Sequence, residues 1–393
     1  MQPHRREIPL GIVFSTTGAY ATVGRDMRDG ALLAIEAVNA GLCGDVRLAP
    51  QIVDPGGVLD AYRVACDDLL GRAGIRHLVG CYTSSSRKEI IPVVEKFDAL
   101  LWYPSHYEGF ESCDNVIYGG AAPNQHVVPL AGWALPRYGH DVYCVGSNYV
   151  WSWETTRIMR ELVEGAGGRV LRERYLPIGA TDVDAILREV RDTAPDVVFN
   201  TLIGESSYAF YRAYHRLSRQ EERFRAERRP ILSCTLSEPE VQAIGPGAAC
   251  GHIACSVYFQ SIERAENAAF VRAFQSRFGA HRVTSADAEA AYVTTLLLAT
   301  SLQAAGTDRV PEVKRATYDC RLAAPQGDVR IDPENNHAWL TPRIGRATAD
   351  GQFRVEWEAA APSRPDPYLA RLDRSLVVAD GARRPPLRLV GRT

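Results

Sequence analysis

Short apolar runs alternate with amphipathic stretches along the first part of the chain. Runs rich in Ile, Val and Leu are typical of strands, and apolar residues spaced every three or four positions are typical of helices. The pattern predicts strands at 8–15, 47–53 and 76–81, and helices at 25–39, 59–72 and 87–97. Strands that alternate with helices form parallel sheets covered on both faces, because each crossover places a helix over the sheet.

The same alternation starts again after residues 121–124. It predicts helices at 125–137, 154–164, 183–192 and 206–219, and strands at 141–146, 169–175, 196–201 and 231–234. A chain of 393 residues is also too long for one compact core. The sequence therefore predicts an α/β protein with two lobes, each a doubly wound parallel sheet.

The apolar segments do not predict a membrane span. Residues 288–302 are rich in Ala and Leu, but they are shorter than the roughly 20 apolar residues that cross a bilayer. We expect a buried helix there. Residues 1–7 run directly into the first strand without an apolar signal segment, which predicts a cytoplasmic chain. A signal peptide upstream of Met1 would reverse this expectation.

Composition and charge narrow the classes of partner. The chain has 45 Lys and Arg against 47 Asp and Glu, a net charge of -2, so no global field draws it onto nucleic acid or an acidic membrane. The nine cysteines are odd in number and scattered, which predicts reduced thiols rather than a disulfide framework. The tail, residues 369–393, is rich in Arg and Pro, and we expect it to lie over the surface or to move freely.

Common catalytic signatures are absent. The chain contains no G-x-x-x-x-G-K-[ST], G-x-G-x-x-G, G-x-S-x-G or H-E-x-x-H pattern. Cys250 and Cys255 do not have the two-residue spacing of a zinc knuckle. We therefore expect no cofactor, no metal and no enzymatic activity. An amidohydrolase is the third alternative, and it predicts ammonia release from acetamide.

Four strand ends carry the residues that best suit a small ligand. They are 14–18, 79–88, 100–111 and 145–153, each a strand that runs into hydroxyl and aromatic residues. Ligands of open parallel sheets lie beyond the carboxyl ends of the strands, near free helix N–H groups. Two alternatives stay open: one of Ser84, Ser85 and Ser86 could only cap a helix, and Glu205 could either face a cleft or cap the next helix. His106 could serve only loop packing.

A set of short motifs resembles one branch of the type I periplasmic binding-protein (Leu/Ile/Val-binding-like) family. This branch contains the amide-sensing negative regulators of aliphatic amidase operons and the urea or short-chain-amide binding proteins of transporters. The resemblance covers roughly residues 8 to 368. It rests on 80–82, 103–104, 107–109, 122–125, 145–149, 258–259, 324–327, 335–337 and 364–368.

The resemblance implies a two-lobed clamp with three chain crossings. One lobe would contain 1–121 and 250–328, and the other 122–249 and 329–368. An amide or urea would be held in the cleft between them. The ligand-binding candidates are Tyr82, Thr83, Ser84, Ser85, Tyr103, Ser105, His106, Tyr149, Trp151, Gly204, Glu205 and Tyr258. Ser105 and His106 depart from the family pattern, which has a threonine at the first of these positions.

The pocket chemistry follows from the ligand. An amide has one carbonyl acceptor and N–H donors, so the site needs partners for both. We expect Ser84 and the N–H groups of its helix to bind the carbonyl, and Tyr82, Ser105 and Tyr149 to bind the nitrogen or one another. The leading hypothesis is a cytoplasmic amide sensor that closes on its ligand and controls an RNA-binding antitermination partner. The alternative is an extracytoplasmic receptor that delivers urea or amide to an ABC transporter. The sequence leaves open whether the chain forms a homo-oligomer.

Overall fold

The computed structural model describes residues 6–371 and divides them into two compact units. Unit 1 contains the chain up to Ala121 together with Ile262–Leu340. Unit 2 contains Ala122–Ser261 and the described chain from Thr341. The expectations for residues 1–5 and for the tail from residue 372 lie outside the described part.

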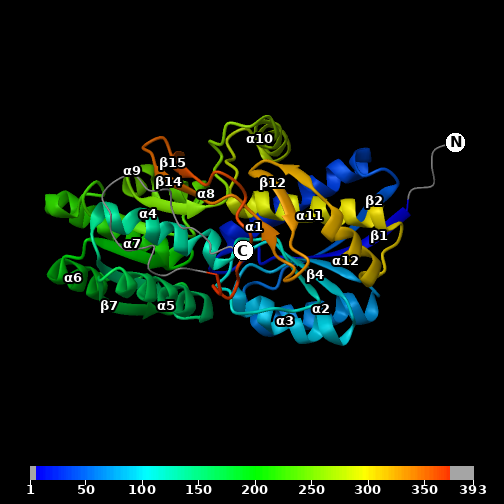
Figure 1. Cartoon of the computed structure of the whole chain (residues 1–393), viewed down its shortest axis with the longest axis horizontal. Helices are drawn as coiled ribbons and strands as arrows, with labels where there is room; N and C mark the ends of the chain where they lie inside the picture. The colour runs from blue at the N-terminus through cyan, green and yellow to red at the C-terminus, as the bar shows by residue number, and fades with distance from the viewer. Residues whose placement is uncertain (1–5, 372–393) are drawn as a thin grey trace. The chain divides into compact units, whose positions relative to one another are not determined.

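Unit 1 is built on a five-stranded parallel sheet with the order β2-β1-β3-β4-β5. The strands are β1 (Arg6–Val13), β2 (Val46–Val53), β3 (His77–Gly80), β4 (Leu100–Tyr103) and β5 (Val116–Tyr118). The helices are α1 (Ala21–Ala37), α2 (Leu59–Asp67), α3 (Ser84–Lys96), α10 (Ala265–Phe278), α11 (Ala286–Ala305) and α12 (Val310–Asp319). In Figure 1, α11 lies on one side of β4, and α2 and α3 lie on the other.

The core of unit 1 follows from the predicted pattern. Leu78 of β3 pairs with Leu101 of β4, and both pack with Ile90 and Val94, which lie four residues apart on α3. On a helix this spacing places two side chains on one face, so α3 covers the sheet with its apolar side. A small antiparallel sheet of β11 (Leu322–Ala324), β12 (Gly327–Ile331) and β13 (Ala338–Trp339) completes the unit.

Unit 2 contains a seven-stranded sheet with the order β15-β14-β10-β9-β8-β6-β7. Its strands are β6 (Asp141–Ser147), β7 (Arg169–Leu176), β8 (Val197–Thr201), β9 (Ile231–Ser233), β10 (Ile253–Ser256), β14 (Arg343–Ala347) and β15 (Phe353–Glu358). The pairs β10–β14 and β14–β15 are antiparallel, and the others are parallel. Its helices are α4 (Val127–Tyr138), α5 (Val150–Gly165), α6 (Asp184–Thr193), α7 (Glu205–Gln220), α8 (Glu238–Ile244) and α9 (Pro246–Ala249).

The chain crosses between the units later than the resemblance implied at two of the three crossings. The first crossing follows Ala121, at the expected position. The segment from residue 250 was expected in the first lobe, but β10 pairs with β9 and β14 and so belongs to the sheet of unit 2. The segment from residue 329 was expected in the second lobe. It stays in unit 1, because β13 pairs with β12 and Tyr118 forms a parallel bridge with His337.

Most predicted elements are present, and the main error is in where helices begin. Helices α1, α3 and α5 begin at Ala21, Ser84 and Val150, several residues before the predicted starts. Their first turns contain polar or mixed residues, which the apolar periodicity does not register. The apolar segment 288–302 forms most of α11, which is a largely buried helix as expected.

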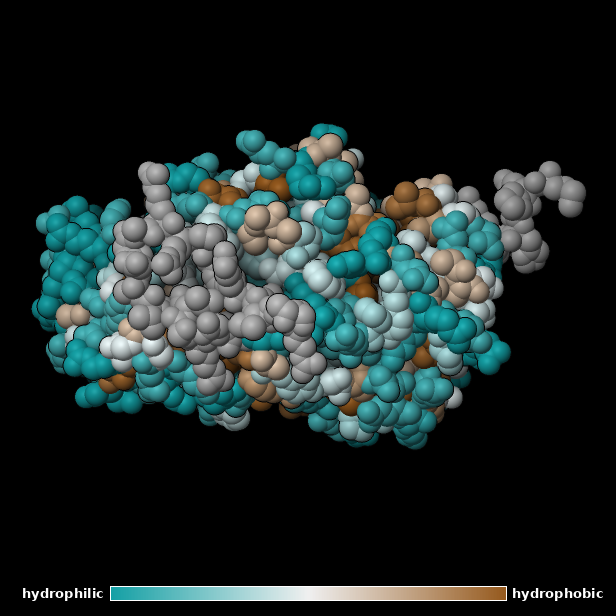
Figure 2. All heavy atoms as spheres, viewed as in Figure 1, coloured by the Kyte–Doolittle hydropathy of each residue, from teal (hydrophilic) through white to brown (hydrophobic). Residues whose placement is uncertain are grey.

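The surface carries few large apolar side chains. Figure 2 shows a mostly hydrophilic face on which the hydrophobic patches are small and separate. Among residues 6–371, no helix is both long and apolar enough to cross a membrane. All nine cysteines are free, and eight are buried, in agreement with the prediction of unpaired thiols.

Candidate ligand-binding site

In the main sheet of each unit there is one strand after which the chain adds its next two strands on opposite sides. In unit 1, β1 is followed by β2 on one side and β3 on the other. In unit 2, β6 is followed by β7 on one side and β8 on the other. Ligands of open α/β sheets bind beyond the carboxyl ends of the strands at such a switch point, because the two following loops diverge there. Of the candidates, Tyr82, Thr83, Ser84 and Ser85 follow β3 at the first of these points, and Tyr149, Trp151, Gly204 and Glu205 follow β6 and β8 at the second. The others follow β4 (Tyr103, Ser105 and His106) or β10 (Tyr258).

The loop between β3 and α3 is held in an unusual backbone conformation. Gly80 has no room for a side chain, since a Cβ atom there would lie 2.5 Å from the carbonyl oxygen of Val13. The next residue, Cys81, has a φ of 67°, which is costly for a residue with a side chain. Local strain of this kind is concentrated at functional sites, so the β3–α3 loop is the centre of the candidate site.

Helix α3 is capped by Thr83, not by one of the three serines. Thr83 is extended, with φ of -78° and ψ of 147°, and its hydroxyl accepts a hydrogen bond from the Ser86 N–H at 3.1 Å. The alternative left open, that one of the serines only caps this helix, is excluded, because the helix begins at Ser84 and the cap is the residue before it. Ser84 therefore lies in the first helical turn, and its side chain is available for other contacts.

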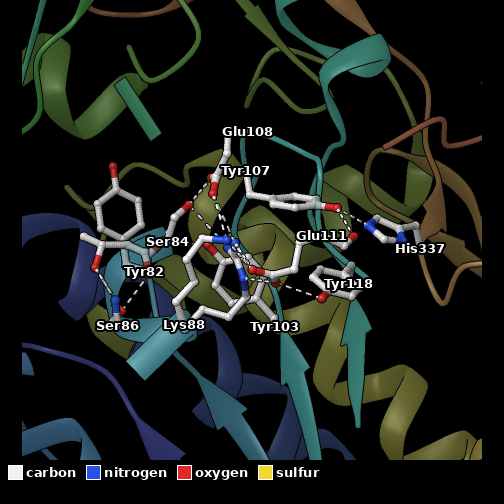
Figure 3. A network of polar contacts seen from close by, with 12 residues as sticks. Tyr82, Ser84, Ser86, Lys88, Tyr103, Tyr107, Glu108, Glu111, Tyr118 and His337 are labelled. Atoms are coloured by element: carbon white, nitrogen blue, oxygen red, sulfur yellow. Dashed lines mark hydrogen bonds and ion pairs between the residues drawn. The ribbon is translucent and has the colours of Figure 1, made fainter. Parts of the chain in front are cut away.

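The hydroxyl of Ser84 belongs to a buried ionic network (Figure 3). It donates a hydrogen bond to Oε2 of Glu108 and accepts one from the Arg87 guanidinium at 3.3 Å. Arg87 is fully buried and lies 4.6 Å from the ring centres of both Tyr103 and Tyr107. These aromatic faces stabilise the cation in place of water.

Two carboxylates balance two cations in this network. Arg87 Nε donates to Glu111 at 2.7 Å, and its other end lies 3.4 Å from Glu108. Lys88 Nζ lies 2.6 Å from Glu111 and 3.6 Å from Glu108. Burial alone would raise the pKa of Glu111, but the charges of Arg87 and Lys88 outweigh it and lower the pKa to about 2. The network is therefore internally neutral.

An aromatic stack continues the network towards the small sheet. The rings of Tyr118 and His337 are parallel and 4.1 Å apart, and the Tyr118 hydroxyl donates to Glu111. His337 Nδ1 faces the carbonyl oxygen of Asn335 at 2.5 Å, so this nitrogen carries the proton, and Nε2 accepts from the hydroxyl of Tyr107. Burial lowers the pKa of His337 to about 4, so the imidazole is neutral at pH 7.

The end of β4 provides the second group of candidates. The phenol of Tyr103 donates to the backbone carbonyl of Tyr82 at 2.9 Å, and burial raises its pKa. Ser105 is buried, and its hydroxyl lies near that of Tyr103 without forming a hydrogen bond of normal geometry. His106 is half-buried. A buried hydroxyl without a good partner is suited to bind a polar group of a ligand.

Four of the five candidates in unit 2 lie at the other switch point. Tyr149 precedes α5, and its ring stacks on that of Trp151 at 6.2 Å. Gly204 precedes α7 with a φ of 57°, and Glu205 is exposed in the first turn, so Glu205 complements the helix dipole and does not cap the helix. Tyr258 is fully buried just after β10. The Ile203 N–H donates to Ser147 Oγ at 3.1 Å and ties the β8 and β6 loops together.

The charged and aromatic half of the site in unit 1 was not among the predicted site residues. The predicted residues Tyr82, Ser84, Tyr103 and Ser105 come together at the ends of β3 and β4. The residues behind them were not predicted, and they are Arg87, Lys88, Tyr107, Glu108, Glu111, Tyr118 and His337. The signal available in the sequence was a pair of acidic residues three positions apart, Glu108 and Glu111, after the aromatic loop. The preceding helix carries the two basic residues, Arg87 and Lys88.

Within residues 6–371, no group of three or more His, Cys, Asp and Glu side chains could hold a metal ion. The groups described at the site in unit 1 are hydroxyls, phenols and paired charges.

Comparison with known families places this site in context. A family model described as "Periplasmic binding protein domain" matches residues 8–374. The chain belongs to this family. The match covers nearly all of both units, and it agrees with the type I periplasmic binding-protein fold expected from the motifs.

Several solved structures share the fold at low sequence identity. A solute binding protein of an ABC transporter from Rhodopseudomonas palustris HaA2, in complex with p-hydroxybenzoic acid, is 20% identical with a TM-score of 0.81, over 91% of this chain and 98% of that one. A solute binding protein from R. palustris in complex with benzoate is 18% identical with a TM-score of 0.80, over 92% and 98%. The branched-chain amino acid binding protein of Streptococcus pneumoniae, in complex with isoleucine, is 18% identical with a TM-score of 0.75, over 91% and 100%.

A curated relative matches part of the chain. Limonene hydroxylase of Geobacillus stearothermophilus is 32% identical over 127 residues, which are 32% of this chain and 23% of the relative. The match thus spans less than a quarter of that protein's length. The periplasmic binding protein fold, in contrast, accounts for almost all of this chain.

Proposed function

We propose that the chain binds a small uncharged amide or urea at the switch point of unit 1 and releases it unchanged. One observation carries this proposal. The charged groups of the site, Arg87 and Lys88 with Glu108 and Glu111, are paired with one another, so the groups left for a ligand are hydroxyls, phenols and backbone N–H groups. Neutral donors and acceptors suit a neutral polar solute.

The site chemistry differs from what a carboxylate ligand needs. Benzoate, p-hydroxybenzoate and isoleucine, the ligands of the three solved neighbours, each have a carboxylate. At the switch point of unit 1 a carboxylate would approach Glu108, while the guanidinium of Arg87 is already engaged by two acids. Like charges at short range in a buried site are unfavourable. The charge pattern therefore favours an amide over these anions.

The size of such a ligand limits its affinity. The best small ligands gain about 1.5 kcal/mol per heavy atom, so a four-atom molecule such as acetamide or urea gains at most about 6 kcal/mol. That free energy corresponds to a dissociation constant of roughly tens of micromolar. We expect binding in this range or weaker.

We propose that the chain delivers its bound ligand to an ABC transporter. The family and the three solved neighbours, which are transporter binding proteins by name, support this role. It places the chain outside the cytoplasm, on the side from which the transporter takes its solute.

The second candidate is a cytoplasmic amide sensor that controls an antitermination partner. It rests on the resemblance, three of whose motifs converge in unit 1. Residues 80–82, 107–109 and 335–337 are far apart in sequence, and all of them lie in or beside the network of unit 1. The branch that carries these motifs includes both amide regulators and transporter receptors.

Isothermal titration calorimetry with acetamide, propionamide and urea tests the ligand, with acetate, benzoate and isoleucine as charged comparisons. We expect binding of at least one neutral compound and no detectable binding of the three charged ones. Tight binding of benzoate or isoleucine would contradict the proposal, and so would the absence of binding by every neutral compound. Because a ligand that binds only the folded chain raises its melting temperature, thermal shifts provide a second readout.

The two roles are separated in the source cell. Deleting the gene should abolish uptake of labelled amide or urea if the chain serves a transporter. If the chain is instead a regulator, deletion should leave uptake intact and change amidase expression in the absence of amide.

A further inference from the structure

We infer that Glu108 determines ligand specificity by turning the Ser84 hydroxyl into a hydrogen-bond acceptor, so that this position takes an N–H donor and rejects a carboxylate. The inference rests on the proposed function and assigns the role of each group within it. It also reverses the sequence-based expectation that Ser84 binds the ligand carbonyl.

The direction of the hydrogen bond follows from the partners. A serine hydroxyl has one proton and two lone pairs. Oε1 of Glu108 faces the cations of Arg87 and Lys88, and Oε2 takes the Ser84 hydroxyl. A carboxylate placed between two cations acts as an acceptor, so the single proton of Ser84 points towards Glu108.

The Ser84 hydroxyl has one lone pair left to accept a further hydrogen bond. Arg87 has only donors, and its Nη1 lies 3.3 Å from Ser84 Oγ and occupies one lone pair. The other lone pair is left for a donor. Ser84 is 1% exposed, so bulk water does not compete freely for that position. A ligand N–H group meets this requirement, whereas a carbonyl or carboxylate oxygen does not.

The first turn of α3 provides the matching donors. The first N–H groups of an α-helix have no intrahelical acceptor. In α3 the Ser86 N–H is bound by the Thr83 side chain and the Arg87 N–H by the Thr83 carbonyl. The N–H groups of Ser84 and Ser85 have no acceptor among residues 6–371. They face a ligand carbonyl with the positive end of the helix dipole behind them.

An amide satisfies both sides, because its carbonyl takes the helix N–H groups and its nitrogen donates to Ser84. Acetate has the same shape as acetamide, but both of its oxygens are acceptors and its charge would lie near Glu108. The pair acetamide and acetate therefore isolates the proposed effect. The ratio of their dissociation constants is the quantity that the inference predicts.

The test measures both constants by calorimetry at pH 7 for the wild type, Ser84→Ala and Glu108→Gln. We expect the wild type to favour acetamide by at least about 100-fold. Ser84→Ala should weaken acetamide by about tenfold or more and leave acetate nearly unchanged, so the ratio falls. If Ser84 instead donated to a ligand oxygen, the substitution would weaken both ligands alike and the ratio would stay constant, which would overturn the inference.

Glu108→Gln tests the acid itself. A glutamine amide can donate to Ser84 and so release the hydroxyl proton towards the ligand. We expect the variant to bind acetamide more weakly and acetate more tightly. Its preference for acetamide over acetate should fall at least about tenfold. Glu111→Gln is the matched control, because it removes one charge from the same network without touching Ser84, and its ratio should stay within twofold of the wild type.

The outcomes separate the two claims. A wild type that binds neither acetamide nor any other neutral compound defeats the proposed function and the inference with it. A wild type that binds acetamide, with ratios unchanged in Ser84→Ala and Glu108→Gln, leaves the proposed function intact and defeats the inference alone. Because Ser84→Ala changes no buried charge, it remains informative even if Glu108→Gln fails to fold.

Discussion

Unit 1 contains two buried ionic clusters, each at the start of a capped helix, and they differ in charge balance. The site cluster lies at α3 and pairs Arg87 and Lys88 with Glu108 and Glu111. The second cluster lies where α1 meets α11. It contains three acids, Asp26, Asp29 and Asp287, with Arg28 and Arg282. We call it the acidic cluster.

The difference appears in the pKa values. In the site cluster, equal numbers of charges lower the pKa of Glu111 to about 2 despite its burial. In the acidic cluster, burial raises the pKa of Asp26 to about 6, although Arg282 opposes it. Burial together with the charge of Asp26 raises the pKa of Asp287 to about 7. Burial thus raises the pKa of a carboxyl where acids outnumber cations, and enough cations reverse the direction of the shift.

The largest expected effect is the loss of the buried cation at the site. Arg87→Met leaves Glu108 and Glu111 facing each other with only the partly exposed Lys88. Breaking a buried ion pair from one side typically costs about 3–5 kcal/mol, so we expect a loss of that size in the free energy of unfolding. Urea denaturation at pH 7 measures it.

Arg282→Met is the corresponding change in the acidic cluster. The Arg282 side chain is 28% exposed, so water screens its interactions, and we expect a loss of about 1 kcal/mol. Equal losses in the two variants would show that burial of the cation does not separate the clusters.

The next effect is a gain in stability from removing the excess acid. Asp287→Asn should raise the free energy of unfolding by roughly 2–4 kcal/mol at pH 8 and change it little at pH 4, at about 1.4 kcal/mol per pKa unit. Asp287 has a folded pKa of about 7 against an ordinary value of 3.8. The folded chain therefore holds the proton more tightly, and stability falls as pH rises from about 4 to about 7.

Glu111 changes the stability with pH in the opposite direction. Its folded pKa of about 2 lies below the ordinary 4.5, so its contribution to stability is present above pH 4.5 and is lost as pH falls towards 2.

Urea denaturation of Asp287→Asn and the wild type across pH 4–8 measures the difference that belongs to Asp287. A difference that does not change with pH would contradict the assignment.

The smallest expected effect comes from the two helix caps. Thr83 caps α3, and Ser285 caps α11 by accepting the Ala288 N–H at 3.1 Å. Replacing either by Ala should cost about 1 kcal/mol. Ser285 also donates to Asp26 at 3.3 Å, so Ser285→Ala should raise the Asp26 pKa further, and its cost should grow from pH 4 to pH 8. Thr83→Ala should show no such growth in thermal denaturation over the same range.

Much of the fold could be predicted from the sequence because its signals are local. The period of apolar residues identified strands such as β1, β2, β6 and β8 within a few residues. It placed the start of α3 too late, because Ser84, Ser85 and Ser86 carry no apolar signal. It also could not assign β10 to a sheet, since strand partners depend on contacts distant in sequence.

The candidate site could be located but not completed. Hydroxyl and aromatic residues after β3 and β4 marked the place, since strand ends of parallel sheets collect ligands. Arg87 looks like an ordinary solvated residue beside Lys88 in the sequence. Its burial between Tyr103 and Tyr107 depends on β4 and on the loop after it, which no local pattern describes.

The sequence by itself determined the α/β alternation and the residue types at the strand ends, because backbone propensity and apolar period act over a few residues. Only the tertiary structure decided which acid faces which base, and therefore which way the proton of Ser84 points. Hydrogen-bond direction depends on partners 3 Å away in space, and Glu108 and His337 reach the network from distant parts of the chain.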